Sequence, residues 1–251
     1  MTDTVSSYEL RNRRALVTGA GQRVGAAIAR RLGHEGMHVA IHYFESRSGA
    51  LATEQAVRDG GGKGVSLQGD LRTPEACARL IEEAAEVLGG LDVVVASAAD
   101  FEPASLAKIT QKQWSATMAL NLEAPLWLAQ HAAPFLRNSR GAIVFVTCHS
   151  TVRPFKGYLP YVVSKAALKQ LMRALALELA PEVRVNAVAP GAVLPPDDAE
   201  PSARTRMAQR NLLGKLGRAE DVADAVMYLL SAPFVTGQQL LVDGGQFLEA
   251  H

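Results

Sequence analysis

From residue 15 onward, short runs of apolar residues, many of them β-branched, alternate with longer segments whose apolar residues recur with the helical period. This alternation constrains the fold most, because consecutive parallel strands need a crossover connection, which is usually a helix. Runs such as LDVVVA are apolar throughout, as in strands that are covered on both faces. The pattern predicts a doubly wound α/β fold with seven mainly parallel strands, at residues 15–18, 37–42, 64–68, 91–96, 142–147, 183–188 and 239–242.

The length of the chain fits one domain of this kind. A chain of 251 residues with 48% hydrophobic residues can bury a sizeable core in one layered α/β domain. No internal repeat or break in composition divides it. We therefore expect residues 1–14 to be a polar lead-in and residues 15–251 to be a single dinucleotide-binding catalytic domain of the Rossmann type.

Charge and composition exclude several classes of partner. The formal net charge is +1, so no chain-wide field attracts nucleic acid or an anionic membrane. No segment reaches the ~18 to 20 apolar residues of a membrane helix, and the first residues do not resemble a signal peptide. Cys77 and Cys148 cannot form a disulfide framework, and the histidines show no metal-ligand spacing. We expect a cytoplasmic protein without a metal, nucleic-acid or membrane partner.

Two of the predicted helices have distinctive features. In the helix that follows residue 73, Thr73 is an N-cap, Pro74 suits the first helical position, and Gly89 and Gly90 follow the last turn. A second helix, over residues 114–136, carries an apolar face that we expect to pack in the core or against another subunit. Its members are Met118, Leu122, Leu126 and Phe135.

One connection is unusually long for a compact domain. Residues 191–211 contain Pro195, Pro196, Asp197 and Asp198 and show no clear periodicity. Loops of this length in compact domains are often lids over a binding site. We expect the same here.

A glycine-rich turn, TGAGQRVG at residues 18–25, joins the first strand to the first helix. The N–H groups at a helix N-terminus and the positive end of the helix dipole attract phosphate, and glycines let a phosphate approach the backbone. The turn therefore indicates a nucleotide phosphate site. A plain tight connection is an equally common role for such a turn.

Tyr161 and Lys165 lie four residues apart in a predicted helix and so share one face. A fixed ammonium near a phenol stabilises the phenolate and lowers a pKa that starts near ~10, which makes the phenol a usable acid or base. Taken alone, such a pair is more often a solvated surface pair.

Further motifs follow in a fixed order along the chain. Asp70 follows the third strand, ASAAD occupies residues 96–100, and Asn121 and Cys148 come before the Tyr161 segment YVVSK. NAVAPG occupies residues 186–191, and VTGQQLLVDGG occupies residues 235–245. With these motifs, the chain resembles the short-chain dehydrogenase/reductase family from about residue 14 to residue 248.

The resemblance implies a role for each of these residues. Tyr161 would protonate a substrate carbonyl or imine, Lys165 would bind the nicotinamide ribose and tune Tyr161, and Asn121 would hold a water that links Lys165 to solvent. Asp70 would accept from the adenine amino group. The other cofactor contacts implied are Gly19, Gln22, Arg23, Val24, Tyr43, Ser46, Leu71, Ser97, Ala98, Pro190 and Gly191.

Three positions depart from the family pattern. Arg23 stands where most members have a glycine, and Ser97 and Ala98 lie in a segment that is usually Asn-Asn-Ala-Gly. Cys148, thirteen residues before Tyr161, replaces the serine that orients the substrate. A thiol is a weak donor, so Cys148 is either a poor catalytic group or a small buried filler.

The first departure indicates a branch of the family. Arg23, the His42–Tyr43 pair, Ser46, SAADF at residues 97–101 and RPFKGYLPY at residues 153–161 resemble pteridine reductases. In that branch, Phe101 and Tyr158 would stack on a flat substrate ring. Pteridine reductases commonly have Asp at the position of Cys148, so the substrate stays open.

The end of the second strand indicates the cofactor. Members that prefer NAD usually carry an Asp there, whereas this chain has Tyr43 and Phe44. Arg23, Ser46 and Arg47 are possible donors to the 2′-phosphate of NADPH. Glu45 would repel that phosphate unless it points outward. We therefore predict NADPH as the cofactor.

These observations predict an NADPH-dependent oxidoreductase that reduces a carbonyl or imine. A pterin-like substrate is the first choice, and a 3-oxoacyl thioester on acyl carrier protein, or another small carbonyl compound, is the second. A third possibility is a sensor that binds NADP(H) without turnover, because Cys148 removes the usual carbonyl donor. By resemblance, we expect a homotetramer.

Overall fold

The computed structural model describes residues 9–193 and 200–248 and contains one seven-stranded sheet with the order β3-β2-β1-β4-β5-β6-β7. Every strand pair is parallel. The predicted fold class is confirmed. The strands are β1 (Arg14–Val17), β2 (His38–Tyr43), β3 (Gly64–Gln68), β4 (Val93–Ala96), β5 (Ala142–Val146), β6 (Arg184–Pro190) and β7 (Gln239–Val242). β3 and β7 match their predicted ranges, and the ends of the others shift by one or two residues.

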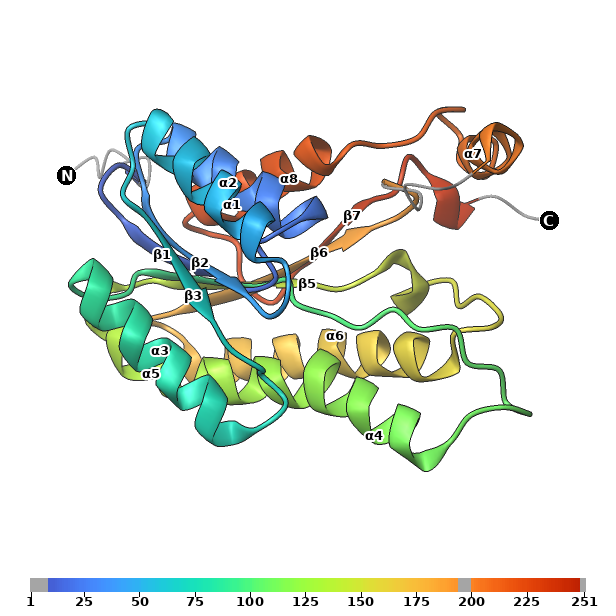
Figure 1. Ribbon diagram of the computed structural model, residues 1–251, viewed down its shortest axis with the longest axis horizontal. Helices are drawn as coiled ribbons and strands as arrows, with labels where there is room; N and C mark the ends of the chain where they lie inside the picture. Colours follow the sequence, from blue (N-terminus) through green and yellow to red (C-terminus); the bar gives the residue numbers. More distant parts are fainter. Residues whose placement is uncertain (1–8, 194–199, 249–251) are drawn as a thin grey trace.

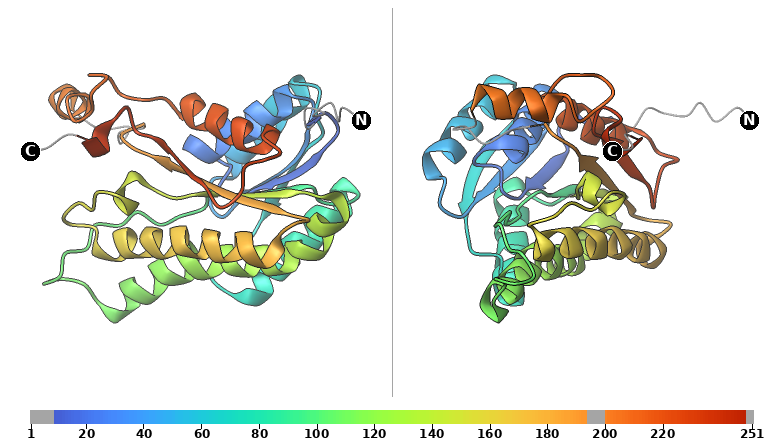
Figure 2. Two further views of the ribbon diagram at one scale, coloured as in Figure 1. Left: turned by 180° about the vertical axis from the view of Figure 1, so that it is seen from behind. Right: turned by 90° about the vertical axis from the view of Figure 1, so that its right-hand side faces the viewer.

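Helices cover both faces of the sheet, as Figures 1 and 2 show. Side chains of β1 alternate between the two cores, since Ala15 and Val17 belong to one and Leu16 to the other. This explains why the strands are apolar throughout. One face carries α1 (Arg23–His34), α2 (Arg47–Asp59) and α8 (Ala219–Ser231), and the other carries α3 (Pro74–Leu88), α5 (Ala124–Ser139) and α6 (Leu159–Leu179).

The ends of α3 agree with the prediction. Thr73 Oγ1 accepts a hydrogen bond from the Ala76 N–H at 3.3 Å, and Pro74 is the first helical residue. Gly89 ends the helix in the left-handed conformation, with φ 76°. Each end therefore has the cap that the sequence indicates.

The helix predicted over residues 114–136 is interrupted. It consists of α4 (Gln111–Met118), a π-helical turn η1 (Ala119–Glu123) and α5. A π turn inserts one extra residue, which rotates the following helix by about 100°. The predicted apolar face therefore lies at the edge of the core, half-buried, while Leu128, Ala132 and Leu136 fill the core itself.

Ion pairs fasten β1 to β4 at the opposite edge from the functional cleft. Asp92, which is 2% exposed, accepts from the Arg14 backbone N–H at 2.8 Å and from Arg14 Nε at 2.7 Å. Burial alone would raise the pKa of Asp92, but the hydrogen bonds and charge of Arg14 lower it below its ordinary value. β1 begins at Arg14, the last residue of the predicted lead-in, and residues 1–8 lie outside the described residues.

Candidate active site

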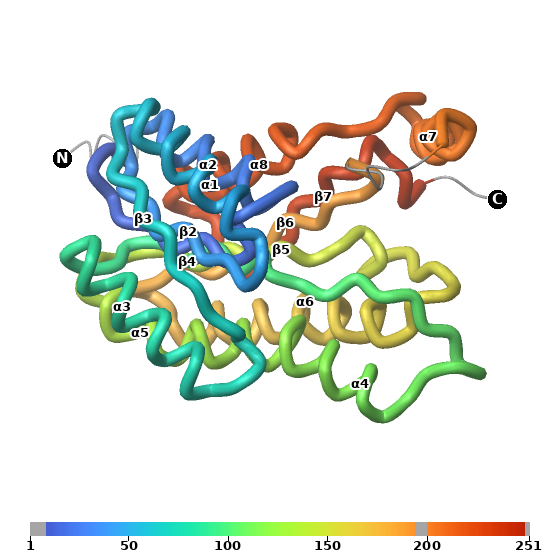
Figure 3. Tube along the Cα trace, viewed as in Figure 1, coloured from blue at the N-terminus to red at the C-terminus, as the bar shows by residue number. Residues whose placement is uncertain are grey.

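A cleft of about 1480 Å³ opens at the carboxyl ends of the strands, where the sheet order changes direction between β1 and β4. The connections that follow β4, β5 and β6 leave on this side of the sheet (Figure 3). The volume exceeds the ~300 to 1,000 Å³ of common ligand pockets, as a dinucleotide with a substrate requires. Most residues of the predicted site line this cleft: Gly19, Gln22, Arg23, Val24, Tyr43, Ser46, Asp70, Leu71, Ser97, Ala98, Phe101, Cys148, Tyr158, Tyr161, Lys165, Pro190 and Gly191.

The glycine-rich turn forms a tight cradle at the N-terminus of α1. A Cβ on Gly19, whose φ is 64°, would lie 2.9 Å from Ala98 Cα, and a Cβ on Gly25 would lie 2.3 Å from the Gly19 carbonyl oxygen. Side chains at these positions would close the turn. The space that they leave, with the first N–H groups of α1, fits a phosphate.

Two buried side chains that the sequence did not single out for a role hold this cradle in place. His42 Nδ1 accepts from the Gly19 N–H at 3.2 Å, and His42 Nε2 lies 3.0 Å from the Gly69 carbonyl oxygen. Burial lowers the pKa of His42 to about 4, so the ring is neutral with its proton on Nε2. Thr18 Oγ1 accepts from the N–H groups of Ser97 and Ala98, each at 3.0 Å.

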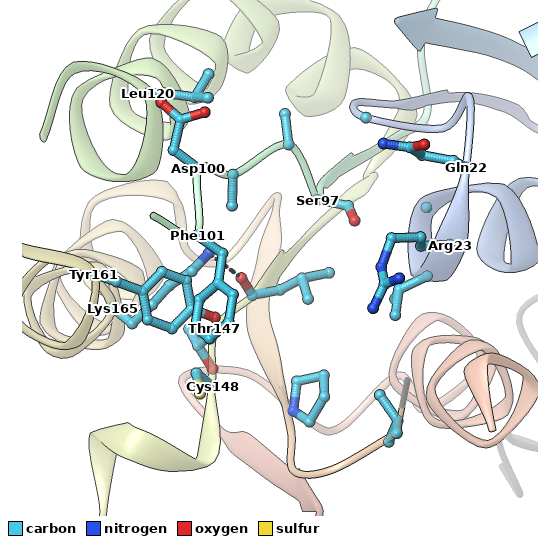
Figure 4. A pocket seen from close by; sticks show the side chains of 18 of the residues that line it. Gln22, Arg23, Ser97, Asp100, Phe101, Leu120, Thr147, Cys148, Tyr161 and Lys165 are labelled. Atoms are coloured by element: carbon cyan, nitrogen blue, oxygen red, sulfur yellow. Dashed lines mark hydrogen bonds between the residues drawn. The ribbon is translucent and has the colours of Figure 1, made fainter. Parts of the chain in front are cut away.

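Arg23 adopts a left-handed backbone conformation, with φ 54°. This explains why a glycine is usual at this position in the family that the sequence resembles. A residue with a side chain there costs about 1 to 3 kcal/mol, a strain often found at functional sites. The side chain is exposed and extends into the cleft on the side where Ser97 lies (Figure 4).

The end of the cleft nearest the glycine-rich turn is formed by residues that follow β2 and β3. Phe44 and Glu45 are exposed, whereas Tyr43 is buried. A Cβ on Gly21 would lie 2.2 Å from Ser46 Oγ, so Ser46 packs directly on the glycine-rich turn. Arg72, which no sequence motif indicated, donates a hydrogen bond from Nη1 to Asp70 Oδ1. Its guanidinium carbon lies 5.8 Å from the centre of the Phe44 ring.

Tyr161 and Lys165 lie together at the other end of the cleft, as predicted (Figure 4). Lys165 is 2% exposed, and its Nζ donates to the Val146 carbonyl oxygen at 2.8 Å and lies 5.7 Å from the centre of the Tyr161 ring. Burial lowers the pKa of Lys165 to about 8.

The predicted direction of the Tyr161 pKa is wrong for the protein without a ligand. Burial raises the pKa of the phenol well above its ordinary value, and the neighbouring Cys148 adds to the increase. The cost of removing a phenolate from water therefore outweighs the attraction of the Lys165 ammonium. Tyr161 is protonated at neutral pH, which is the state of a proton donor.

Cys148 has two contacts in the site. It caps the short 3-10 helix η2 (His149–Thr151), where its Sγ accepts from the Ser150 N–H at 3.4 Å. Its side chain also lies beside the Tyr161 phenol, whose pKa it helps to raise. The thiol therefore touches the candidate proton donor, whether or not it touches a substrate.

Arg47, a possible phosphate donor, does not line the cleft, and neither does Asn121. Asn121 is fully buried in the π-helical turn, where Oδ1 accepts from the Asp100 N–H at 2.8 Å. Nδ2 donates to the Asp100 carbonyl oxygen at 3.0 Å and to Ser164 Oγ at 3.2 Å. Because these bonds occupy the side-chain amide, the backbone carbonyl is the group that can hold the expected water.

Phe101 and Tyr158 stack on each other rather than leaving a gap for a ring. Their ring centroids are 4.3 Å apart, with planes 7° from parallel. Phe101 also meets Tyr161 edge to face, at 4.6 Å and 77°. A planar ligand can therefore stack on the outer face of Phe101 but cannot lie between the two rings.

Other walls of the cleft come from η2 and from α7 (Pro201–Ala208). His149 stacks on Phe155 at 5.7 Å, burial lowers the pKa of His149, and its Nδ1 has no hydrogen-bond partner. From α7 and the residues after it, Ala203, Met207 and Arg210 line the cleft. Residues 194–199 of the predicted lid, with Pro195, Pro196, Asp197 and Asp198, lie outside the described residues.

Residues 9–193 and 200–248 contain neither a membrane-spanning helix nor a metal cluster. None of their helices is both long enough and apolar enough to span a membrane. They also contain no group of three or more His, Cys, Asp or Glu side chains placed to hold a metal ion.

Comparisons with known proteins agree with this arrangement. The family model described as enoyl-(acyl carrier protein) reductase, of the adh_short_C2 type, matches residues 19–246. 3beta-Hydroxysteroid dehydrogenase 1 of Eggerthella lenta is 34% identical over 249 residues, which cover 96% of this chain and 95% of that protein.

Two solved structures are also similar over nearly the whole chain. A short-chain dehydrogenase from Burkholderia cenocepacia in complex with NADP has a TM-score of 0.88 and 34% identity, covering 95% of this chain and 99% of that one. FolM alternative dihydrofolate reductase 1 from Brucella suis, in complex with NADP, has a TM-score of 0.90 and 29% identity, covering 96% and 97%. The chain therefore belongs to the short-chain dehydrogenase/reductase family of oxidoreductases.

Proposed function

We propose that the protein is an NADPH-dependent reductase of a planar heterocycle of the pterin type. The observation that carries this proposal is the aromatic wall in which Phe101 stacks on Tyr158 and stands against Tyr161. A flat ring on the outer face of Phe101 lies beside the candidate proton donor. The similarity to a FolM dihydrofolate reductase supports the same substrate class.

The cleft fits NADPH in several places. The cradle of Gly19 and Gly25 accepts the pyrophosphate, and Asp70 accepts from the adenine amino group. Pro190, Gly191 and Lys165 hold the nicotinamide riboside at the other end. Gln22, Val24, Tyr43, Leu71, Ser97 and Ala98 line the space between.

The 2′-phosphate decides between the two coenzymes. We assign it to Ser46 and Arg23, whose donors suit a phosphate, and NADP is bound in two of the similar structures. Glu45 is exposed and can turn toward solvent, which removes its repulsion. NADPH, when bound, supplies the hydride for the reduction.

The proton comes from the chain itself. Tyr161 is protonated at neutral pH and can donate its hydroxyl proton to a carbonyl oxygen or imine nitrogen. Lys165 then stabilises the phenolate that remains, because its ammonium is held near the ring. Cys148 has a small role in this scheme, since a thiol donates only weakly.

A 3-oxoacyl thioester on acyl carrier protein, or another small carbonyl compound, is the second candidate. The matching family model, described as an enoyl-(acyl carrier protein) reductase, supports a substrate carried on acyl carrier protein. A sensor without turnover is less well supported, because Tyr161, Lys165 and Asn121 are all present in the site or directly behind it.

NADPH oxidation with a panel of substrates tests these alternatives. The panel contains dihydropterins, quinones and 3-oxoacyl thioesters, and the loss of NADPH absorbance reports turnover. We expect the highest kcat/KM with a dihydropterin. A higher value with a thioester would favour the second candidate, and tight NADPH binding without any oxidation would favour the sensor.

We also propose that the protein is a cytoplasmic homotetramer. An apolar surface for subunit contact is offered by the half-buried Leu122 of η1 and Trp127 and Phe135 of α5, together with the exposed Trp114 of α4. The small-molecule substrate and NADPH are the other partners that we expect.

A further inference from the structure

Arg72 connects the ends of three strands across the top of the cleft. Its Nη1 donates to Asp70 Oδ1 at 3.0 Å, after β3, and its Nη2 donates to Asp100 Oδ2 at 2.9 Å, after β4. The guanidinium also lies over Phe44, after β2. One planar side chain therefore bridges the adenosine end of the cleft and the loop that carries Phe101.

A continuous series of hydrogen bonds extends from Asp100 to the backbone carbonyl of Tyr161, the candidate proton donor. The backbone of Asp100 pairs on both sides with the Asn121 amide, at 2.8 and 3.0 Å. Asn121 Nδ2 donates to Ser164 Oγ, and that hydroxyl donates to the Tyr161 carbonyl oxygen at 2.8 Å. Four links therefore join Arg72 to the Tyr161 backbone. They run from Arg72 to Asp100, from Asp100 to Asn121, from Asn121 to Ser164, and from Ser164 to the Tyr161 carbonyl oxygen.

We propose that Arg72 is a positioning residue that couples the adenosine end of the cleft to the geometry of the Tyr161 end. The inference rests on the proposed NADPH site, because the adenine amino group is the ligand donor for Asp70. Arg72 donates two hydrogen bonds to Asp70, one from its backbone N–H and one from Nη1, and both go to Asp70 Oδ1. Asp70 Oδ2 can therefore accept a hydrogen bond from the adenine amino group. The same guanidinium holds Asp100, whose backbone clamps Asn121.

Arginine suits this position for a geometric reason. The planar fork presents two N–H groups in fixed directions, one to each carboxylate, whereas a lysine ammonium is a single point of charge. The bonds are only half-buried, since the side chains of Arg72, Asp70 and Asp100 are 31%, 45% and 28% exposed. Their contribution therefore lies between an exposed ion pair and a buried one, and solvent screens part of it.

A purely local role would give a different result. If Arg72 only supports the adenosine site, its loss weakens NADPH binding but leaves kcat at saturating NADPH unchanged. If it also positions Asp100, its loss lowers kcat at saturation and loosens the Asp100–Asn121 pair even when no ligand is bound. The two roles can therefore be separated.

The test compares Arg72→Gln, Asp100→Asn, the double variant and Arg72→Lys with Arg79→Gln, an exposed arginine of α3 that does not line the cleft. Amide hydrogen exchange measures the Asp100 N–H, which donates to Asn121 Oδ1. In the protein without ligand, we expect exchange about 3- to 10-fold faster in Arg72→Gln and Asp100→Asn, but not in Arg79→Gln. The double variant should exchange no faster than either single variant, because both remove the same bond.

Turnover gives the second readout, with the best substrate of the panel and saturating NADPH. We expect kcat about 3- to 10-fold lower in Arg72→Gln, with Arg72→Lys failing to restore it. Wild-type exchange at Asp100 in Arg72→Gln, or a full rescue of both readouts by Arg72→Lys, would overturn the proposal. The exchange experiment needs no ligand, so a failure of the proposed function, seen as absent NADPH binding in the wild-type protein, is recognised separately.

Discussion

At the scale of single residues, burial controls the protonation of the Tyr161–Lys165 pair, since it raises the pKa of the phenol and lowers that of the ammonium. The spacing of Tyr161 and Lys165 places both on one face of α6, and the structure brings them into the same cleft. The direction in which the Tyr161 pKa shifts was mispredicted, because the shift depends on burial of the phenol and on Cys148. Phe101, from another part of the chain, packs against the same ring. Spacing in one helix carries no information about elements that pack against it from elsewhere in the chain.

The charge of Lys165 predicts a pH dependence. The pKa of Lys165 is about 8, so its ammonium is present below that pH and is lost as the pH rises through it. The phenolate left by proton transfer from Tyr161 then loses its stabilising cation. We expect kcat for reduction to be level below about pH 8 and to fall above it, measured as NADPH oxidation at saturating substrate.

Two variants check this assignment. Tyr161→Phe removes the proton donor and should lower kcat by about 10² or more, with little change in the Kd for NADPH. Lys169→Met, one turn further along α6, should keep the wild-type pH profile. A kcat that rises through pH 8, or a Tyr161→Phe enzyme with comparable turnover, would contradict the proposed roles.

Cys148 is a second test at this scale, because its Sγ both caps η2 and contacts Tyr161. Serine can make both contacts, so Cys148→Ser should keep or raise kcat. If the thiol orients the substrate as a weak donor, Cys148→Ala should lower kcat by the equivalent of about 0.5 to 1.5 kcal/mol, and it also loses the cap, worth about 0.5 to 2 kcal/mol of stability. Enzyme assays and chemical unfolding measure the two losses.

The Cys148 series also bears on the substrate. If Cys148→Asp raises kcat/KM for dihydropterins but not for 3-oxoacyl thioesters, the pterin proposal gains support. Equal kcat values in the wild-type, serine and alanine enzymes would show that the thiol takes no part in the chemistry.

At the scale of elements, the ends of α3 were predicted because they depend on local sequence signals. The π-helical turn between α4 and α5 was not predicted, because it depends on packing. Thr73, Pro74 and Gly89 define α3 from the sequence alone. The π-helical turn at Ala119–Glu123 has no such local signal. It buries Asn121 against Asp100 and Ser164, and these partners come from the β4 loop and α6. For the same reason, the sequence did not show that Asn121 lies behind the cleft.

His42 holds the ends of three elements together and predicts how stability depends on pH. It accepts from Gly19, after β1, and donates to Gly69, after β3, only as a neutral ring. The pKa of His42 is about 4 in the folded protein, below the ordinary value of 6.5. The contribution of neutral His42 to the free energy of unfolding is therefore complete above pH 6.5 and is lost as the pH falls toward 4. Between pH 7 and pH 5 the loss from His42 should be about 2 kcal/mol.

Urea unfolding at pH 7 and pH 5 measures this contribution by difference. The wild-type protein should lose about 2 kcal/mol more than His42→Asn between these values, because asparagine does not titrate. An identical loss in His42→Asn and the wild type would assign the pH dependence to other groups.

At the scale of the whole molecule, alternation along the sequence predicted the layers, and the family resemblance predicted where the cleft lies. Residues 191–211 were expected to lie over a binding site, but neither signal predicted that they contain a helix, α7. α7 has no buried residue and lies beyond the sheet edge near β7, yet Ala203 and Met207 line the same cleft as Gly19. A helix without a buried face leaves little periodic pattern in the sequence, so this segment was predicted as a loop.

This position predicts that ligands stabilise α7 more than the rest of the molecule. Because α7 is anchored by few core contacts, its amides should open locally in the protein without ligand. NADPH and substrate fill the cleft that Ala203, Met207 and Arg210 line, and contacts worth about 1.4 kcal/mol would slow exchange in α7 about tenfold. Hydrogen exchange in the protein alone, with NADPH, and with NADPH and substrate measures the effect. α8 does not line the cleft and is the internal control. If the exchange rates of α7 are the same in all three states, or if ligands slow exchange in α8 as much as in α7, then α7 is a fixed wall and not a ligand-dependent cover.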